Sequence, residues 1–93
     1  ADDHWRALAS HANAMAARLA EGLAASGRRL AYPVQANEVF PVLDEATVAR
    51  LKEAGARFYE WSREGCGEGE AIVRLVTSFA TSEAMVDGFL AGL

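Results

Sequence analysis

The 93-residue sequence has a single cysteine, a single lysine and no long apolar run, and each scarcity excludes a class of protein. Cys66 has no partner for a disulfide within the chain, so the reducing cytoplasm is the expected location. Every apolar run is shorter than the roughly 18 residues that a membrane-spanning helix needs. The N-terminus also lacks the charged-then-apolar pattern of a secretion signal.

Basic residues are also scarce. Nine lysines and arginines stand against thirteen aspartates and glutamates, which gives a net charge of −4. The basic residues are scattered along the chain, whereas a surface for nucleic acid or anionic lipid needs a basic excess in one region. The composition therefore predicts neither nucleic acid nor membrane as a partner. The length suits one modest core, so residues 1–93 are expected to form a single domain.

The first long segment has the periodicity of an amphipathic helix. Apolar residues recur at spacings of three and four from Trp5 to Leu23. Asp2 or Asp3 is expected to cap its start, and Gly27 to end it in a left-handed conformation. Such a helix is long for a small domain, so we expect part of it to contact something beyond its own core.

Two pairs of strands separated by a second helix follow in the sequence. Residues 28–32 and 37–43 are predicted strands, and Pro41 should make the second an edge strand or a bulged one. Asp44 is expected to cap a helix that ends at Gly55. The segment 57–61 is a third predicted strand, rich in aromatic residues.

A glycine-rich turn at 62–70 leads to the most apolar strand, from Ile72 to Val76. Thr81 is expected to cap a last helix with its apolar face towards the core. The order is therefore α-β-β-α-β-β-α. This order predicts an α+β fold in which helices pack mainly on one face of a small antiparallel sheet.

Arg74 is unusual because it lies in the middle of that apolar strand. Alternation places it on one face with Ile72 and Val76. A guanidinium keeps its proton, so a buried arginine needs an anion. Three explanations are open: the face is wet, Arg74 pairs with a carboxylate such as Glu38 or Glu60, or it binds a ligand through a bidentate fork.

The other candidate sites have simpler explanations. The segment GCGEGE (65–70) lacks the Gly-Lys-Ser/Thr ending of a phosphate loop, and Cys66 within it has no basic neighbour that would activate a thiol. His4 and His11 are too far apart on a helix to share a metal ion. Lys52 matches no cofactor motif. We therefore predict no catalytic residue, no cofactor-binding residue and no metal ligand in this chain.

Polar and aromatic residues elsewhere are expected to be structural. Gln35 and Asn37 are most simply turn residues, although polar amides there could also indicate an edge or a surface covered by another domain. The aromatic side chains are expected to lie mostly in the core. These are Trp5, Phe58, Tyr59, Trp61, Phe79 and Phe89.

Four segments together resemble a known family. They are HANAMAARLAEGL (11–23), PVQANEVFPVL (33–43), FYEW (58–61) and VRLVTSFAT (73–81). The sequence resembles the C-terminal small domain of low-specificity L-threonine aldolases, which are pyridoxal-phosphate enzymes of the aspartate-aminotransferase fold type (fold type I). The Arg-Leu-Val-Thr core is the most specific element.

This resemblance implies a function for Arg74. The matching arginine of the family binds the α-carboxylate of the amino-acid substrate, while the large domain holds the cofactor and its Schiff-base lysine. The family cleaves β-hydroxy-α-amino acids to glycine and an aldehyde. The resemblance therefore implies that pyridoxal phosphate belongs to a parent enzyme, that this chain alone neither binds it nor catalyses, and that a large domain and a homo-oligomer complete the site.

Other functions remain open at this stage. Ser78 follows Val-Thr where many relatives carry histidine, so the subfamily is open. A β-eliminating lyase of the same fold type is an alternative, because a carboxylate-binding arginine would serve either reaction. A stand-alone amino-acid-binding regulatory module would also use a carboxylate-binding arginine. A third possibility is an interaction module that docks through the long first helix.

Overall fold

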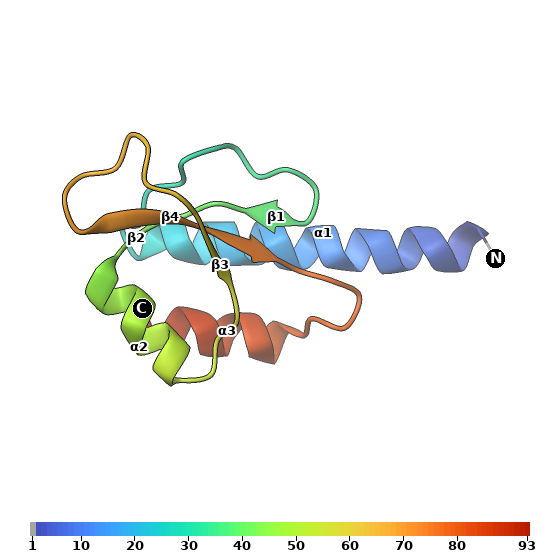
Figure 1. The fold of residues 1–93 in the computed structure, drawn as a ribbon. Coiled ribbons are helices and arrows are strands. Elements are labelled where there is room, and N and C mark those ends of the chain that lie inside the picture. The colour runs from blue at the N-terminus through green and yellow to red at the C-terminus, as the bar shows by residue number, and fades with distance from the viewer. Residues whose placement is uncertain (1) are drawn as a thin grey trace.

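The computed structural model describes residues 2–93, and side chains from His4 onwards. The elements follow the order α-β-β-α-β-β-α, which confirms the predicted α+β class (Figure 1). They are α1 (Asp2–Ala25), β1 (Glu38–Val39), β2 (Val42–Asp44), α2 (Glu45–Glu53), β3 (Tyr59–Ser62), β4 (Glu70–Val76) and α3 (Glu83–Ala91). The predicted cap at Asp2 or Asp3 lies outside the described side chains.

Strand β4 is the centre of the antiparallel sheet, and every other strand pairs with it. Strands β1 and β2 pair with β4 in one constant register, from Glu38 opposite Val76 to Asp44 opposite Glu70. That register sets Phe40, in the gap between the two strands, opposite Arg74. On the other side of β4, Tyr59 of β3 is the partner of Arg74.

The predicted strand 28–32 is wrong, and the predicted strand 37–43 is divided in two. Leu30 forms only an isolated bridge with Pro41. The Ala31 N–H donates to the Phe40 carbonyl and the Val42 N–H to the Arg29 carbonyl, and these two bonds flank the single bridge. The Pro41 carbonyl accepts from Val73 of β4, so the N–H that proline lacks is missing on the β4 side, where it separates β1 from β2.

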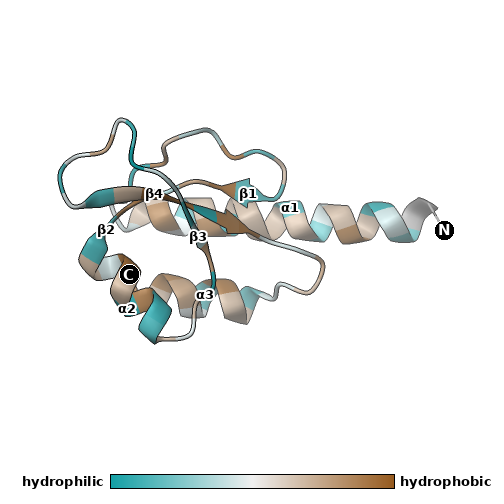
Figure 2. Cartoon of the chain, viewed as in Figure 1, coloured by the Kyte–Doolittle hydropathy of each residue, from teal (hydrophilic) through white to brown (hydrophobic). Residues whose placement is uncertain are grey.

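The helices lie on one face of the sheet and enclose the main core (Figure 1). Val73 and Leu75 of β4 point into it, with exposures of 0% and 6%. Figure 2 shows α3 and the second half of α1 coloured mainly as hydrophobic. The buried members of this core are Met15, Ala16, Leu19, Ala20, Leu23, Val39, Leu43, Leu51, Val73, Leu75 and Val86.

Among the described residues, the helix ends follow the expected signals except at Thr81. Gly27 and Gly55 have positive φ angles of 84° and 99°, as left-handed residues after a helix do. Asp44 accepts a hydrogen bond from the Thr47 backbone and caps α2. The cap of α3 is Ser82, which accepts from the Met85 backbone, whereas the predicted Thr81 accepts from the Ser78 backbone in the preceding turn.

The prediction that the aromatic side chains lie mostly in the core is wrong. Trp5, Tyr59, Trp61 and Phe79 are between 53% and 73% exposed. Only Phe58 and Phe89 of the six pack against the main core, edge to face with each other. Trp5 is exposed because the start of α1 extends past the sheet, in a molecule measuring 48 × 25 × 22 Å (Figure 1).

Within the described residues, no helix is both long and apolar enough to cross a membrane.

Candidate functional site

The candidate site lies on the sheet face opposite the helices. Because side chains alternate along a strand, Val73 and Leu75 face the core while Arg74 faces away from it. The register adds residues of the neighbouring strand to the same surface. We call this surface the outer face; it comprises Glu38, Phe40, Val42, Ile72, Arg74 and Val76.

Arg74 forms an ion pair with Glu38 on the outer face. Its Nε donates to Glu38 Oε1 over 2.8 Å, and its Nη2 donates to the same oxygen. Glu38 is directly opposite Val76 and therefore diagonal to Arg74, a spacing that long side chains bridge readily. The sequence alone allows either Glu38 or Glu60 as the partner. The structure selects Glu38, while Glu60 pairs with Arg63 at 2.8 Å.

A row of aromatic rings continues the site along the outer face. The Arg74 guanidinium lies over the ring of Trp61, 5.7 Å from its centroid, within the range of a cation–π interaction. The ring centroids of Trp61 and Phe40 are 5.4 Å apart, and those of Phe40 and Tyr32 are 5.3 Å apart in an edge-to-face arrangement. Phe40, Val42 and Ile72 form a small buried cluster on the outer face, whereas the Arg74 side chain is partly exposed.

The guanidinium is only partly occupied by these contacts. The Arg74 side chain is 36% exposed, and the Glu38 side chain 30%. Among the described residues, Arg74 Nη1 makes no hydrogen bond within the chain. The edge formed by Nη1 and the outer N–H of Nη2 has the fork geometry that receives a carboxylate.

A two-residue hairpin fixes the position of Glu38. Its backbone N–H and C=O both bond to Gln35, at 2.8 and 3.2 Å. Ala36 at the turn has a φ of 53°, a left-handed conformation unfavourable for alanine. Asn37 donates from its side chain to the Thr77 carbonyl at 2.7 Å. The two predicted turn residues, Gln35 and Asn37, thus hold the turn to the sheet.

The buried hydroxyl of Thr77 links the end of β4 to the long helix. It donates to the Ala12 carbonyl of α1 at 2.6 Å, and the Thr77 side chain is almost fully buried. The hairpin, β4 and α1 are therefore joined at the same point. The sequence offered no signal for this link, because it depends on residues that are 65 positions apart.

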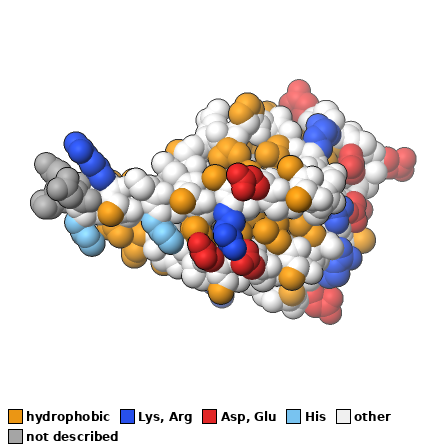
Figure 3. Space-filling view, turned by 180° about the vertical axis from the view of Figure 1, so that it is seen from behind, with side chains coloured by type: hydrophobic (Ala, Val, Ile, Leu, Met, Phe, Trp, Pro, Cys, Tyr) orange, Lys and Arg blue, Asp and Glu red, His pale blue; other side chains and the backbone are white. Residues whose placement is uncertain are grey.

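The other candidate residues from the sequence, the two histidines and Cys66, do not contact Arg74, and His11 and Cys66 make structural contacts instead. The His11 ring nitrogen Nε2 is 2.5 Å from the Thr81 carbonyl. Figure 3 shows histidine side chains, in pale blue, at the surface towards the narrow end of the molecule. Cys66 is partly buried against the smaller cluster of Phe40, Val42 and Ile72.

The residues of this chain do not fit pyridoxal phosphate. Lys52 is the one lysine available for a Schiff base, and its ammonium lies over the Phe58 ring, 5.6 Å from the centroid. The shallow hollow beside it carries the carboxylates of Glu45 and Glu60, both bonded to Arg63. Carboxylates at this position repel a phosphate, and the nearby guanidinium is already engaged.

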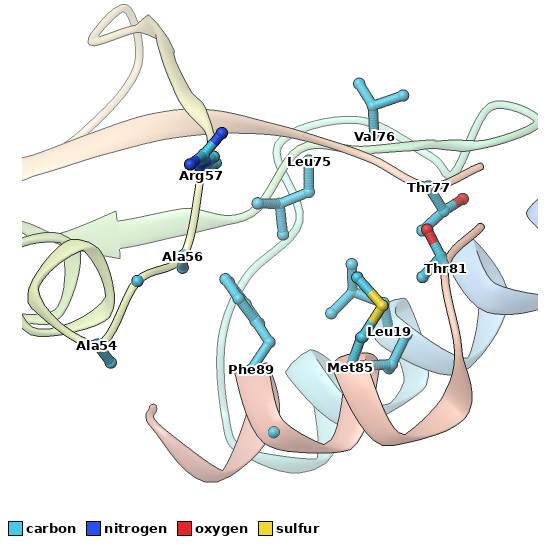
Figure 4. A pocket seen from close by; sticks show the side chains of 13 residues that line it. Leu19, Ala54, Ala56, Arg57, Leu75, Val76, Thr77, Thr81, Met85 and Phe89 are labelled. Atoms are coloured by element: carbon cyan, nitrogen blue, oxygen red, sulfur yellow. The ribbon is translucent and has the colours of Figure 1, made fainter.

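A second concave region lies on the helical side of the sheet. It is an open hollow of about 470 Å³ at the end of β4. Leu75, Phe89, Leu19 and Met85 point into it (Figure 4). Its lining is largely apolar and has no cluster of charged side chains, so it could hold an apolar group but has no set of polar groups for catalysis.

Two comparisons with known proteins find threonine aldolases. The low specificity L-threonine aldolase of Pseudomonas aeruginosa is 45% identical over 65 residues, which are 69% of this chain and 19% of that protein. The Leishmania major threonine aldolase structure matches with a TM-score of 0.78 and 38% identity, over 87% of this chain and 23% of that one. No family model matches the sequence.

A more distant match shows the fold alone. The serine palmitoyltransferase of Sphingomonas wittichii has a TM-score of 0.69 at 22% identity, over 89% of this chain and 22% of that one. In each case this chain spans about a fifth of the relative's length. From the two nearer matches, the chain is a threonine-aldolase-like domain.

Proposed function

We propose that this chain is the C-terminal domain of a threonine-aldolase-like enzyme and that Arg74 binds the α-carboxylate of its amino-acid substrate. The parent enzyme would cleave β-hydroxy-α-amino acids to glycine and an aldehyde. The observation that carries the proposal is the open edge of Arg74 on a rigid, partly desolvated surface. The similarity to two threonine aldolases supports it.

Arg74 is suited to this role because β4 is the central strand. Both flanking strands pair with β4, and the core residues Val73 and Leu75 fix the backbone on either side. A guanidinium on such a support loses little freedom when it binds a carboxylate. Two parallel N–H···O bonds would then set the orientation of the substrate's Cα, which is a positioning contribution to catalysis.

The cofactor and the chemistry are proposed to come from the rest of the parent chain. Pyridoxal phosphate supplies the electron sink in enzymes of this type. Since Lys52 and its surroundings do not fit the cofactor, we propose that the isolated domain binds none and is inactive. We further propose a large cofactor-binding domain as the partner of the outer face, in a cytoplasmic homo-oligomer.

Two alternatives keep the carboxylate site and change its use. A β-eliminating lyase would hold the same carboxylate, and the fold match to a serine palmitoyltransferase shows that this fold occurs in proteins of different names. A stand-alone amino-acid-binding module would need only the open edge of Arg74. Such a module would be stabilised by glycine without any other domain.

The first test is to sequence the natural gene upstream of the codon for Ala1 and to purify the full-length protein that it encodes. We expect the upstream codons to encode a large α/β domain with a Schiff-base lysine. The purified full-length protein should release glycine and acetaldehyde from L-threonine. Release of a 2-oxo acid and ammonia instead would identify the lyase. A start codon close to Ala1 with no such domain would contradict the proposal and favour the amino-acid-binding module.

A further inference from the structure

We infer that Glu38 is the positioning residue for Arg74, holding one edge of the guanidinium so that the other edge is presented to the substrate carboxylate. This inference rests on the proposed function and adds a second residue to the same site. It starts from the fact that two nitrogens of Arg74, Nε and Nη2, donate to one oxygen of Glu38.

This hydrogen-bond pattern defines which edge is held. Nε and Nη2 form the side edge of the guanidinium, and Glu38 contacts it through Oε1 alone. The group is planar and its donors lie in a fixed fork, so restraining the side edge also fixes the direction of the end edge. The end edge contains Nη1, which bonds to nothing among the residues described.

The aromatic contact adds a second restraint on the guanidinium. The Arg74 Cζ lies over the Trp61 ring, 5.7 Å from the ring centroid. One edge of Arg74 is therefore bonded and its cation lies over an aromatic ring before any ligand arrives. A preorganised donor pair binds more tightly because less side-chain entropy is lost on binding.

Glu38 itself is held by backbone contacts. Both of its backbone groups bond to Gln35, and its strand pairs with β4 at Val76. The Glu38 side chain is 30% exposed and is therefore more shielded from solvent than the Glu60 side chain, which is 51% exposed. A partly desolvated pair is weakened less by salt and solvent than a surface pair.

The opposite role for Glu38 makes a different prediction. If Glu38 occupied the position of the substrate carboxylate, the substrate would have to displace it, and removing Glu38 would lower KM. If Glu38 positions Arg74, its removal raises KM. The sign of the change therefore separates the two roles.

The test is a double-mutant cycle in the full-length enzyme, with KM and kcat measured for L-threonine. We expect Arg74→Ala to lower kcat/KM by about 100-fold or more, in line with loss of one partner of a charge-assisted contact. Glu38→Ala should raise KM by about five- to tenfold with a smaller change in kcat. In the Arg74→Ala background, Glu38→Ala should have no further effect. The control is Glu60→Ala. Glu60 lies in the same sheet but pairs with Arg63, so this substitution should leave KM unchanged.

Two further measurements address a variant that does not fold and a KM that differs from the dissociation constant. Glu38→Gln keeps one acceptor oxygen in place and should raise KM by about two- to threefold, so it replaces Glu38→Ala if that variant does not fold. The dissociation constant of glycine, measured by calorimetry, should change in parallel with KM.

The outcomes separate the inference from the function on which it rests. An unchanged kcat/KM in Arg74→Ala would overturn the proposed function. A large effect of Arg74→Ala together with an unchanged or lower KM in both Glu38 variants would overturn the positioning role alone. Additive effects in the cycle would also overturn it, because Glu38 would then act independently of Arg74.

Discussion

Gly22 of α1 lies directly against Leu90 of α3, so closely that a Cβ on Gly22 would be 2.3 Å from Leu90 Cδ1. This contact lets the two helices pack side by side under the sheet. We predict that Gly22→Ala lowers the free energy of unfolding by about 1 kcal/mol, because overpacking outweighs the gain in helix propensity. Urea unfolding of the isolated chain measures the change.

Gly88 provides the matched control for this substitution. It lies within α3, and a Cβ built on it would meet nothing within 4 Å. Gly88→Ala should therefore stabilise the chain by about 0.5–1 kcal/mol through helix propensity alone. Equal stabilisation by both substitutions would show that α1 and α3 are not packed closely at Gly22.

Asp44 should make the free energy of unfolding depend on pH in the acid range. Hydrogen bonds from the Thr47 hydroxyl and backbone lower the pKa of Asp44 below its ordinary value of 3.8, and Arg28 adds a smaller effect. Because the pKa is lower in the folded state, the stabilisation is present above pH 3.8 and is lost as the pH falls through the folded-state pKa. Urea unfolding from pH 7 to pH 3 should show this loss.

Two variants identify the cause of the acid effect. Asp44→Ala should cost about 1 kcal/mol at pH 7, as the loss of a helix cap does. Thr47→Val should bring the Asp44 pKa back towards its ordinary value and so flatten the loss at low pH. A pH profile identical in wild type and Thr47→Val would contradict this explanation.

The isolated chain should self-associate as its concentration rises. Trp61, Tyr59 and Val76 are each more than half exposed close to Arg74, and Phe79 is 66% exposed just after β4. Such a patch is typical of a surface that another domain covers. Sedimentation should show concentration-dependent dimers or larger species that Trp61→Ser weakens.

Met85 offers a control for self-association on the other side of the sheet. It is 60% exposed beside the second hollow, away from the outer face. Met85→Ser should leave the association unchanged. A monomer at all concentrations would count against a covered outer face, and an effect of Met85→Ser alone would move the contact to the helical side.

Pyridoxal phosphate should give no stable lysine-dependent absorbance band with the isolated chain. The Lys52 ammonium lies over Phe58, and the neighbouring carboxylates disfavour a phosphate. A spectrum of the mixture should match that of the cofactor with Lys52→Ala. A stable band that disappears in Lys52→Ala would contradict the prediction.

Local sequence signals predicted much of the fold. The spacing of Ala12, Met15, Leu19 and Leu23 identified the buried side of α1, because helix periodicity is a property of neighbouring residues. The cap at Asp44 and the left-handed glycines at Gly27 and Gly55 are local in the same way. Alternation along β4 also predicted that Arg74 lies on the other face of the sheet from Val73 and Leu75.

Features that depend on distant contacts could not be predicted in this way. Whether Arg74 pairs with Glu38 or Glu60 depends on which strands flank β4 and in which register. The exposure of Trp61 and Tyr59 depends on which sheet face the helices cover. Residues 28–32 have the composition of a strand, but only Leu30 bridges the neighbouring chain, at Pro41, and whether such a bridge extends into a ladder depends on residues far away in the sequence.

The role of Arg74 is tested most directly by the dissociation constant of glycine for the full-length enzyme, compared between wild type and Arg74→Leu. Glycine has no side chain, so its carboxylate and its amino group are its only binding groups. We expect binding to weaken by about 100-fold or more in Arg74→Leu, because a charge-assisted bidentate contact is lost. An equal dissociation constant in the two proteins would show that Arg74 does not bind the substrate carboxylate.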